Sequence, residues 1–525
     1  MAETKRFLWQ CVEHWASVKG DAEALVFEDT RLSWAELARQ VDQAARAFLA
    51  LGVGRGDCVA CISSARPEFV ISFLAASKIS ALWTGISPRY TVGEMGRILR
   101  GCRPTVLITQ ERYHNTNLLE RAFTFNFELA SIEHIILIDG EHGDAPSFHT
   151  ILKKDYSDTA SLYEERLAAA SPGDNALLMY TSGSSGNPKG VLHTHSSVIS
   201  NVSQQHTLYN IHKNSRILLH FPINHVAADV EISYCALFAG ATIVMQPDFN
   251  AKASLEIIEK ENITVLGQVP AMYILQLREP SFHLTRWDSV ETFVWGGSPA
   301  SKEMLEALHR ICSRTGAILV TGYGSTELCG FVTATQKKAP FPVSDQSTGP
   351  VYPNCELRIV DEQRNPLPPG QIGEIAVRGP VVMKGYLNEP IQTAAVLDAA
   401  GWYYTHDLGS LDKEGNLTLH GRRTDMIKTG GENIFPFEIE LTLESHPQIL
   451  FAAITAVPDD VFTEVCHAHV MTVPGSKLTE MQLLSWCRDH LAHFKIPQRV
   501  FFYATLPLLP NGKVDKLKLV EINPL

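Results

Sequence analysis

Residues 177–191 read LLMYTSGSSGNPKGV, and the rest of the chain is organised around them. Apolar and aromatic residues lead into a loop of glycines and hydroxyls that closes on Pro188-Lys189-Gly190. This pattern predicts a buried strand that delivers a donor-rich loop. Glycines let backbone N–H groups approach an anion, the hydroxyls add donors, and the lysine adds a point charge. We therefore predict a phosphate-binding loop whose contacts come from Thr181, Ser182, Gly183, Ser184, Ser185, Gly186 and Lys189.

The spacing in this loop separates it from the common nucleotide motifs. A Walker loop places four residues between its first glycine and the Gly-Lys pair. Here two residues separate Gly183 from Gly186, and two more precede Lys189. A P-loop kinase or ATPase is therefore disfavoured, and no G-x-G-x-x-G motif opens a helix here. The alternative is a solvated Ser/Gly linker, but buried strands do not usually flank such linkers.

Composition and charge limit the class of protein further. The 525 residues are 45% hydrophobic and 19% charged, as in an ordinary globular protein. The net charge of −12 disfavours nucleic acid and anionic membranes as partners, so local donors must hold any nucleotide. No segment approaches the ~20 apolar residues of a membrane span. Ten scattered cysteines suggest reduced thiols and predict a cytoplasmic location. Cys58 and Cys61 should point to opposite faces of a strand, which favours packing over zinc binding.

Strands alternate with helices along most of the chain, which predicts an α/β fold with doubly wound parallel sheets. A capping box at Ser33–Glu36 opens one of the helices. From about residue 348, short strands with Gly and Pro turns indicate a small β unit. We predict a large N-terminal domain, residues 1–421, made of two doubly wound α/β subdomains plus a small β-barrel-like unit. A small mobile α+β C-terminal domain would follow, residues 422–525.

Four further stretches carry polar groups suited to a nucleotide. Residues 321–327 read TGYGSTE after an apolar strand, with Tyr323 able to face a flat base and Glu327 suited to Mg²⁺ beside phosphates. Residues 401–407 place Asp407 on an aromatic-flanked turn, where it could take both ribose hydroxyls. Residues 421–440 begin with Gly421-Arg422 and include a Gly-Gly pair, and residues 509–516 place Lys513 on an Asn-Gly turn. Each stretch read alone could be a solvated turn.

In this order and at these separations, the five stretches resemble the adenylate-forming superfamily. That superfamily contains acyl- and aryl-CoA synthetases, adenylation domains of peptide synthetases and firefly luciferases, and the chain most resembles the acyl-CoA synthetases from about residue 25 to 520. The resemblance implies that residues 181–190 bind the ATP phosphates, that Thr326 meets a phosphate and that Glu327 holds Mg²⁺. It also implies that adenine and ribose contact Gly297, Ser298, Tyr323, Asp407 and Arg422.

The resemblance implies a two-step reaction with ATP, Mg²⁺ and CoA. A carboxylate attacks the α-phosphorus of ATP and gives acyl-AMP and pyrophosphate, and a thiol then releases AMP. Lys513 would be the catalytic lysine, which can counter the repulsion between the two anions. The C-terminal domain would then rotate about Thr424, and Gly430 and Gly431 would face a thiol tunnel. Thr424 replaces the usual Asp or Lys of the hinge, and His406 replaces the usual glycine before Asp407, where we favour a side chain pointing to solvent.

The resemblance also locates the acid pocket. Its lining would come from one stretch after the phosphate loop, from two glycine turns and from a residue near them: His225, Val226, Trp295, Gly296, Gly322, Gly324, Ser325 and Cys329. The early pocket stretch lacks the aspartate with which peptide-synthetase domains pair an α-amine; Asp229 could supply a charge but lies further along. Trp295 stands where the family usually has a small residue, so it could shorten the pocket. We therefore expect an amine-free aryl, cyclic or short- to medium-chain acid.

The identity of the thiol is left open by the motifs. We expect no carrier domain after Lys513, so the first expectation is CoA and the second is a separate carrier protein that a stand-alone adenylating enzyme would load. A non-catalytic adenylate-binding scaffold is a third alternative, although it would not need the lysine. A luciferase-type oxidation is not distinguished by motifs. A homodimer is compatible with the resemblance.

Overall fold

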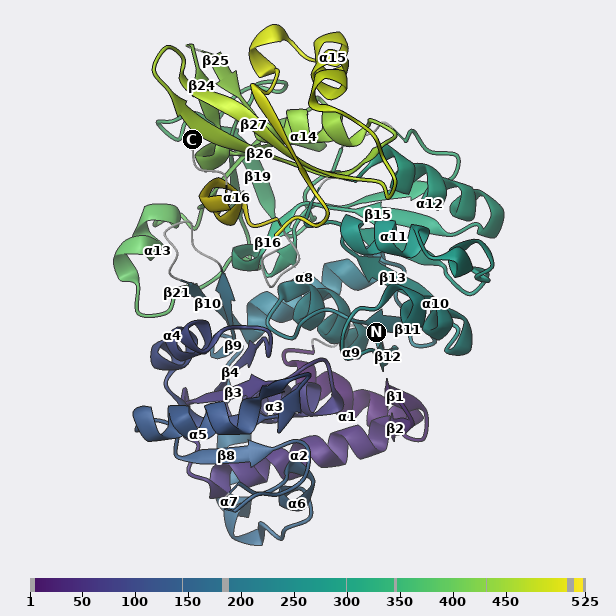
Figure 1. Cartoon of the computed structure of the whole chain (residues 1–525). Coiled ribbons are helices and arrows are strands. Elements are labelled where there is room, and N and C mark those ends of the chain that lie inside the picture. The colour runs from purple at the N-terminus through teal and green to yellow at the C-terminus, as the bar shows by residue number, and fades with distance from the viewer. Residues whose placement is uncertain are drawn as a thin grey trace.

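The computed structural model describes residues 5–143, 145–181, 188–298, 300–343, 347–430, 432–507 and 514–522. It has an α/β fold with two large mixed sheets, a small antiparallel sheet and a C-terminal α+β domain (Figure 1). No helix within these ranges is long and apolar enough to cross a membrane.

A seven-stranded sheet forms the first α/β subdomain, with strand order β21-β10-β9-β4-β3-β5-β8. The five strands from β9 to β8 run parallel. Strand β10 pairs antiparallel with β9, and β21 pairs antiparallel with β10. The strands are β3 (Cys58–Ile62), β4 (Leu82–Ile86), β5 (Pro104–Thr109), β8 (His134–Leu137), β9 (Asn175–Thr181), β10 (Lys189–Thr194) and β21 (Gly385–Tyr386). The helices are α2 (Trp34–Ala50), α3 (Pro67–Lys78), α4 (Val92–Cys102), α5 (Leu118–Glu128), α6 (Phe148–Ile151) and α7 (Ala160–Ala169).

An eight-stranded sheet forms the second subdomain, with order β18-β15-β14-β13-β11-β12-β1-β2. The parallel strands from β15 to β1 are flanked by antiparallel β18 and β2. The strands are β1 (Glu23–Phe27), β2 (Thr30–Ser33), β11 (Arg216–Leu219), β12 (Thr242–Met245), β13 (Val265–Gln268), β14 (Thr292–Trp295), β15 (Ile318–Thr321) and β18 (Thr335–Lys338). The helices are α1 (Leu8–Lys19), α8 (His195–Leu208), the π-helix η2 (Ala227–Tyr234), α9 (Cys235–Ala239), α10 (Ala251–Lys260), α11 (Pro270–Leu277) and α12 (Lys302–Thr315).

The main hydrophobic core lies between these two sheets, where α1, α2, α3, α8, α9 and η2 pack against both. Helices α10, α11 and α12 cover the other face of the eight-stranded sheet over a second core. The predicted capping box at the start of α2 is present. The Ser33 hydroxyl accepts a hydrogen bond from the Glu36 N–H, and the Glu36 carboxylate accepts one from the Ser33 N–H. Cys58 and Cys61 point to opposite sides of β3 and belong to different cores, as predicted.

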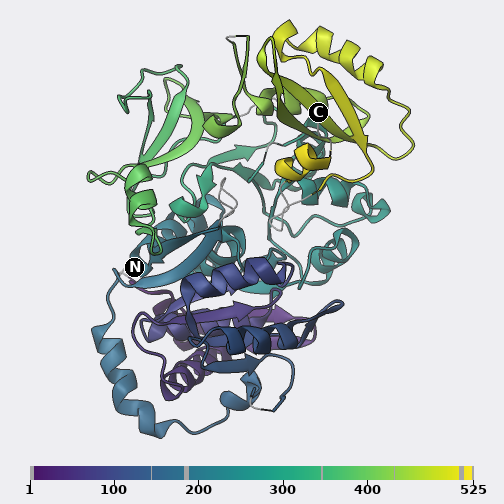
Figure 2. The same ribbon diagram turned by 60° about the vertical axis from the view of Figure 1, so that its left-hand side comes forward.

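The small β unit is a four-stranded antiparallel sheet, β19 (Glu356–Val360), β20 (Gly373–Arg378), β22 (Tyr403–Leu411) and β23 (Leu417–Arg422). Helix α13 (Pro390–Val396) lies beside β21. Figure 2 shows this sheet next to the C-terminal elements, above the two large subdomains. Its last strand leads into a short 3-10 turn, η5 (Arg423–Asp425).

The C-terminal elements have their own hydrophobic core. The strands are β24 (Ile427–Thr429), β25 (Glu432–Ile434), β26 (Ile449–Asp459), β27 (Thr463–Thr472) and β28 (Arg499–Tyr503), and the helices are α14 (Pro436–Glu444), α15 (Glu480–His490) and α16 (Lys516–Ile522). One end of β26 packs on the second subdomain, because Leu450 is buried in the core beneath α12 (Figure 1).

Candidate active site

The flanks of the predicted phosphate loop form a regular antiparallel hairpin. Thr181 at the end of β9 pairs with Lys189 at the start of β10. Residues Ser182, Gly183, Ser184, Ser185 and Gly186 lie outside the described residues. The Lys189 ammonium lies 5.0 Å from the centroid of the Tyr386 ring, which comes from the neighbouring strand β21. The predicted phosphate-binding loop is therefore anchored at its lysine end by the Tyr386 ring.

Glu327 lies beside this lysine–tyrosine pair. The Tyr386 hydroxyl donates to Glu327 Oε1 at 3.1 Å, and the Met383 N–H donates to the Glu327 carbonyl at 2.8 Å. The preceding residue is fixed as well, since Nε2 of buried His193 lies 2.7 Å from the Thr326 carbonyl. Burial lowers the pKa of His193 to about 4, so the ring is neutral and donates here. Glu327 is thus held by a neutral hydroxyl and by its own backbone, and the nearby Arg422 guanidinium adds a favourable charge interaction.

Three predicted nucleotide contacts meet at one carboxylate. The Tyr323 hydroxyl donates to Asp407 Oδ2 at 2.7 Å, and Arg422 Nε donates to Asp407 Oδ1 at 3.1 Å. Asp407 and Arg422 face each other across β22 and β23, whereas Tyr323 follows β15 in the other subdomain. The Asp407 side chain is 15% exposed and the Arg422 side chain 58%, so this chain of contacts runs from the interior to the surface.

Glycines are required where the hairpin β16 (Gly324–Ser325) and β17 (Gly330–Phe331) meets the large sheet. A Cβ on Gly322 would lie 2.1 Å from the Thr333 carbonyl oxygen, and a Cβ on Gly296 would lie 2.3 Å from the Phe331 ring. The Phe331 ring therefore lies directly against both glycine turns of the predicted acid pocket. Gly297 and Ser298, on the predicted adenine side, are exposed.

The residues of the predicted acid pocket are divided between the two faces of the eight-stranded sheet. His225 precedes η2, and its Nδ1 accepts from the Ala227 N–H at 3.1 Å. Val226 and Cys329 share the core between the sheets with Phe331. Trp295 instead packs into the core under α11 and α12, on the opposite face of β14 from Val294. The structure therefore does not bring the Trp295 indole together with the other predicted pocket residues.

The predicted hinge lies next to the ribose-side contacts. Thr424 is exposed in η5, and Arg423 beside it lies 3.6 Å from Glu374 of β20. His406 adopts φ +62°, the conformation in which the family's usual glycine is favoured, and its Nδ1 lies 3.2 Å from Glu374. The ring is half exposed and faces Glu374. Gly430 also has a positive φ, and its N–H donates to the Phe462 carbonyl at 2.9 Å. Gly431 and Lys513 lie outside the described residues.

Sequence reasoning did not single out Tyr386, His193 or Glu374. All three gain their roles through contacts between separate strands. Tyr386 is 59 residues from Glu327, and Glu374 is 32 residues from His406. A tyrosine in a short Gly-Tyr strand gives no local signal of such a contact.

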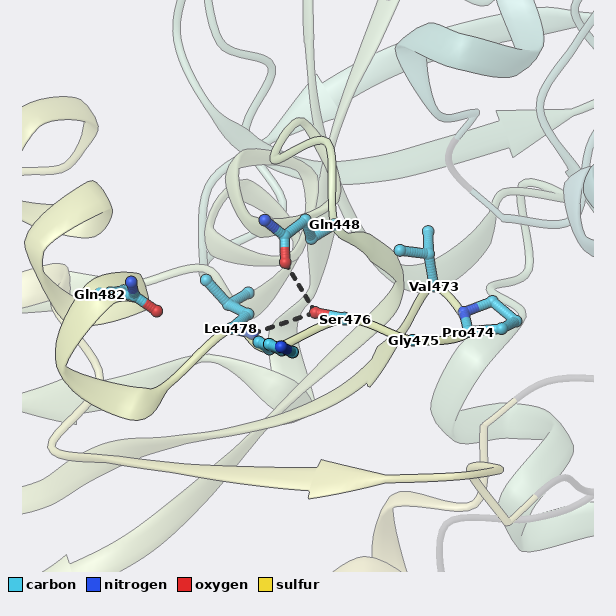
Figure 3. A pocket seen from close by; sticks show the side chains of 8 residues that line it. Gln448, Val473, Pro474, Gly475, Ser476, Leu478 and Gln482 are labelled. Carbon is cyan, nitrogen blue, oxygen red and sulfur yellow. Dashed lines mark hydrogen bonds between the residues drawn. The ribbon is translucent and has the colours of Figure 1, made fainter.

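A hollow of about 370 Å³ opens elsewhere, in the C-terminal domain (Figure 3). Gln448 Oε1 accepts from the Ser476 hydroxyl at 2.7 Å, and the Leu478 N–H donates to the same hydroxyl at 3.1 Å. None of the predicted site residues lines this hollow, and its one charged residue is Lys477. It therefore plays no part in the site built here.

No group of three or more metal-ligating side chains gathers within the described ranges. The candidate Mg²⁺ position offers one carboxylate, Glu327, whose oxygen partner is a neutral hydroxyl. This donor set fits Mg²⁺, which is commonly held by one or two carboxylates together with substrate phosphates.

Comparison with known proteins agrees with the fold. Residues 12–387 match the AMP-binding enzyme family model, and residues 438–513 match the AMP-binding enzyme C-terminal domain. The chain is 32% identical over 509 residues to indoleacetate–CoA ligase of Aromatoleum aromaticum, covering 97% of this chain and 96% of that protein. It is 31% identical to 4-coumarate–CoA ligase CCL1 of Humulus lupulus, covering 94% and 88%. A solved anthranilate CoA ligase in complex with anthranoyl-AMP superposes with a TM-score of 0.88 at 23% identity, covering 98% and 97%.

The chain belongs to the AMP-binding enzyme family, within the adenylate-forming superfamily. It is an AMP-forming acid–thiol ligase, which uses ATP to join a carboxylic acid to CoA.

Proposed function

We propose that this ligase converts an aryl, cyclic or short- to medium-chain acid to acyl-AMP with release of pyrophosphate, and then to the CoA thioester by domain alternation. The observation that carries the proposal is the convergence of two groups at the junction of the subdomains. One is Tyr323–Asp407–Arg422, which suits a nucleoside. The other is Lys189–Tyr386–Glu327, which suits phosphates with their cation.

In the first step, a carboxylate oxygen attacks the α-phosphorus and the bond to the β-phosphate oxygen breaks. Thr181, Lys189 and the hydroxyls between them would hold the departing pyrophosphate, and Thr326 would meet a phosphate. Mg²⁺ on Glu327 would neutralise phosphate charge. Lys513 would bridge the carboxylate and the α-phosphate and so reduce their repulsion.

In the second step, the thiol sulfur attacks the acyl carbon and AMP leaves. We propose that the domain boundary falls at Arg422 and that Thr424 is the hinge, since η5 is a single exposed turn between two separate cores. Rotation would withdraw Lys513 and bring Gly430 and Gly431 beside the thiol.

The aryl class is favoured by the two ligases named above, because indoleacetate and 4-coumarate are both acids with an aromatic ring. The predicted pocket supports the same choice, since Phe331 lies against Gly296 and Gly322 and offers a flat apolar wall.

The test is pyrophosphate release over a panel of aryl, cyclic and linear acids, with and without CoA. We expect acid-dependent release, fastest with aryl acids, and conversion to the thioester when CoA is present. Release without thioester would favour a carrier protein as acceptor, and a purified candidate carrier would then replace CoA. Absence of release with every acid would overturn the proposal in favour of a nucleotide-binding scaffold.

The role of Lys513 is tested separately. Lys513→Ala should reduce acid-dependent pyrophosphate exchange by roughly a hundredfold or more, because removal of one charge-stabilising group typically costs this much. Attack of CoA on supplied acyl-AMP should continue. Lys516→Ala, three residues away, is the matched control and should leave exchange intact. Unchanged exchange in Lys513→Ala would remove this lysine from the first step.

A further inference from the structure

A bulge in strand β22, residues 405–407, carries the ribose-side carboxylate. These three residues stand opposite Ile375 of β20 alone, and His406 at their centre has φ +62°. Such bulges redirect the side chains beside them, which here include that of Asp407. The Thr405 hydroxyl donates to the Ile375 carbonyl at 2.9 Å and accepts from the Asp407 N–H at 3.1 Å. The His406 N–H is directed elsewhere and needs an acceptor of its own.

Glu374 supplies that acceptor and also reaches the proposed hinge. Its Oε1 accepts from the His406 N–H at 2.9 Å and lies 3.2 Å from His406 Nδ1. Its Oε2 lies 3.6 Å from Arg423 Nη1 in η5. The Glu374 side chain is 8% exposed, whereas those of His406 and Arg423 are about half exposed. One buried carboxylate is therefore shared between the bulge in β22 and the exposed turn η5.

The charge of Glu374 depends on both of these partners. Burial would raise the pKa of the Glu374 carboxyl, but the contacts with His406 and Arg423 outweigh burial and lower this pKa below its ordinary value. If the C-terminal domain rotates about η5, Arg423 moves relative to β20 and the carboxylate loses a cationic partner. Such a loss is unfavourable for a charge that is mostly buried. The contact between Arg423 and Glu374 therefore opposes the rotation.

The orientation of the C-terminal domain indicates which half-reaction this contact favours. In Figures 1 and 2, α16, which follows Lys513 in sequence, lies on the side of the C-terminal domain that faces the large subdomains. Strands β24 and β25, which flank the Gly430 loop, lie at the far end of that domain in Figure 1. This is the orientation expected for formation of acyl-AMP, in which the Lys513 segment is at the site.

We propose that Glu374 is a positioning residue with two roles in the reaction. Through the His406 N–H it orients Asp407 for the ribose, and through Arg423 it holds η5 in the orientation that forms acyl-AMP. The carboxylate thereby links nucleotide binding with the domain movement. This inference rests on the proposed function, because it needs both the ribose contact and the hinge at Thr424.

The ribose role is tested with nucleotides alone, by calorimetric titration of ATP and of 2′,3′-dideoxy-ATP. The unmodified enzyme should bind ATP at least tenfold more tightly, because a site built to pair hydroxyls rejects an analogue that lacks them. Glu374→Met keeps the side-chain volume but removes the acceptor, and it should reduce this ratio at least threefold. Glu374→Gln keeps an acceptor and should leave the ratio within about twofold of that of the unmodified enzyme. Equal ratios in all three proteins would overturn the ribose role.

The hinge role is tested with two half-reactions: acid-dependent pyrophosphate exchange, and thioester formation from CoA and supplied acyl-AMP. The acid is the one that the panel described above selects. Arg423→Gln should lower exchange about two- to fivefold, as expected of a half-exposed ion pair, without lowering thioester formation. Arg378→Gln is the matched control, because Arg378 of β20 pairs with Glu356 at 2.7 Å and is similarly exposed. It should change neither rate, and an effect equal to that of Arg423→Gln would overturn the hinge role.

A double variant shows whether Glu374 and Arg423 act as one unit. Glu374→Gln should shift the two rates as Arg423→Gln does, and the double variant should shift them no further, because both changes break the same contact. Multiplied effects in the double variant, or equal losses in both half-reactions, would overturn the hinge role. Each of these results leaves the proposed function intact, because that function is judged by pyrophosphate release and thioester formation in the unmodified enzyme.

Discussion

At the scale of single residues, Tyr386 joins two parts of the proposed phosphate site. Its hydroxyl donates to Glu327 and its ring lies under the Lys189 ammonium. Tyr386→Phe would keep the ring and remove the hydroxyl, so Glu327 would lose the donor that orients it. Because a hydrogen bond to a charged group contributes about 1.5–3 kcal/mol, we expect the Mg²⁺ concentration for half-maximal adenylation to rise roughly tenfold. Titration of Mg²⁺ at saturating ATP measures this. Tyr404→Phe is the control, because the Tyr404 hydroxyl donates to Asp398 and not to Glu327. Equal Mg²⁺ dependence in all three proteins would show that Tyr386 has no role at the metal site.

A second residue gives a pH dependence of stability. Burial raises the pKa of Glu444, on α14, from 4.5 to about 8, although the Ala452 N–H donates to it. Between these pH values the folded protein holds a proton that the unfolded chain has released, so stability falls as pH rises through this window. Glu444→Gln keeps an acceptor and cannot ionise. We therefore expect the variant to exceed the native C-terminal domain in stability by about 5 kcal/mol at pH 9, and to match it near pH 4. Hydrogen exchange of the C-terminal amides checks this, and a constant difference across pH would contradict the assigned pKa.

At the scale of elements, the β26–β27 hairpin carries backbone strain. Thr463 begins β27 with φ +74°, a conformation that a β-branched residue rarely adopts. It lies opposite Thr429, just before the Gly430 loop. Thr463→Gly should relieve the strain, which is about 1–2 kcal/mol, against a smaller entropic cost of glycine, and so raise stability by up to about 1 kcal/mol. Urea unfolding measures the change. Thr463→Val retains the branching and should give no gain; a gain equal to that of glycine would rule out backbone strain as the cause.

The elements also show what a sequence can predict here. Helix α2, strand β3 and the β9–β10 hairpin follow from local patterns: a capping box, a short apolar run, and a glycine-rich loop between apolar steps. The π-helical hydrogen bonding of η2 does not follow from local patterns. Residues 227–234 would suit an α-helix equally well, and the wider π-helical turn depends on tertiary packing. The meeting of Tyr323, Asp407 and Arg422 followed from the family resemblance and is observed. The positions of Tyr386 and Trp295 depended on strand order and on which sheet face each side chain takes, which periodicity alone does not give.

At the scale of the whole molecule, the two domains meet through an apolar contact and a polar one. Leu450 is buried against the core beneath α12, with Phe451, Met471 and Val473 partly buried around it. At the proposed hinge, Arg423 lies 3.6 Å from Glu374. Any rotation of the C-terminal domain must remove Leu450 from this core and change the backbone of η5. The present orientation of the domain is therefore stabilised by contacts that would be lost in a rotated orientation. Movement of this kind requires free backbone dihedrals at one or two residues.

Thr424 is the residue at which this requirement can be tested. Proline fixes φ near −65° and removes the N–H, whereas alanine removes only the side chain and leaves the backbone free. If η5 is the hinge, Thr424→Pro should lower CoA-dependent thioester formation at least tenfold more than it lowers acid-dependent pyrophosphate exchange. Thr424→Ala should change both rates by less than about threefold, because the side chain is exposed. The two half-reactions are measured separately, the second with supplied acyl-AMP. Equal losses in both would mean that the proline disturbs the site itself, and the hinge would then have to lie elsewhere between the cores that end at β23 and begin at β24.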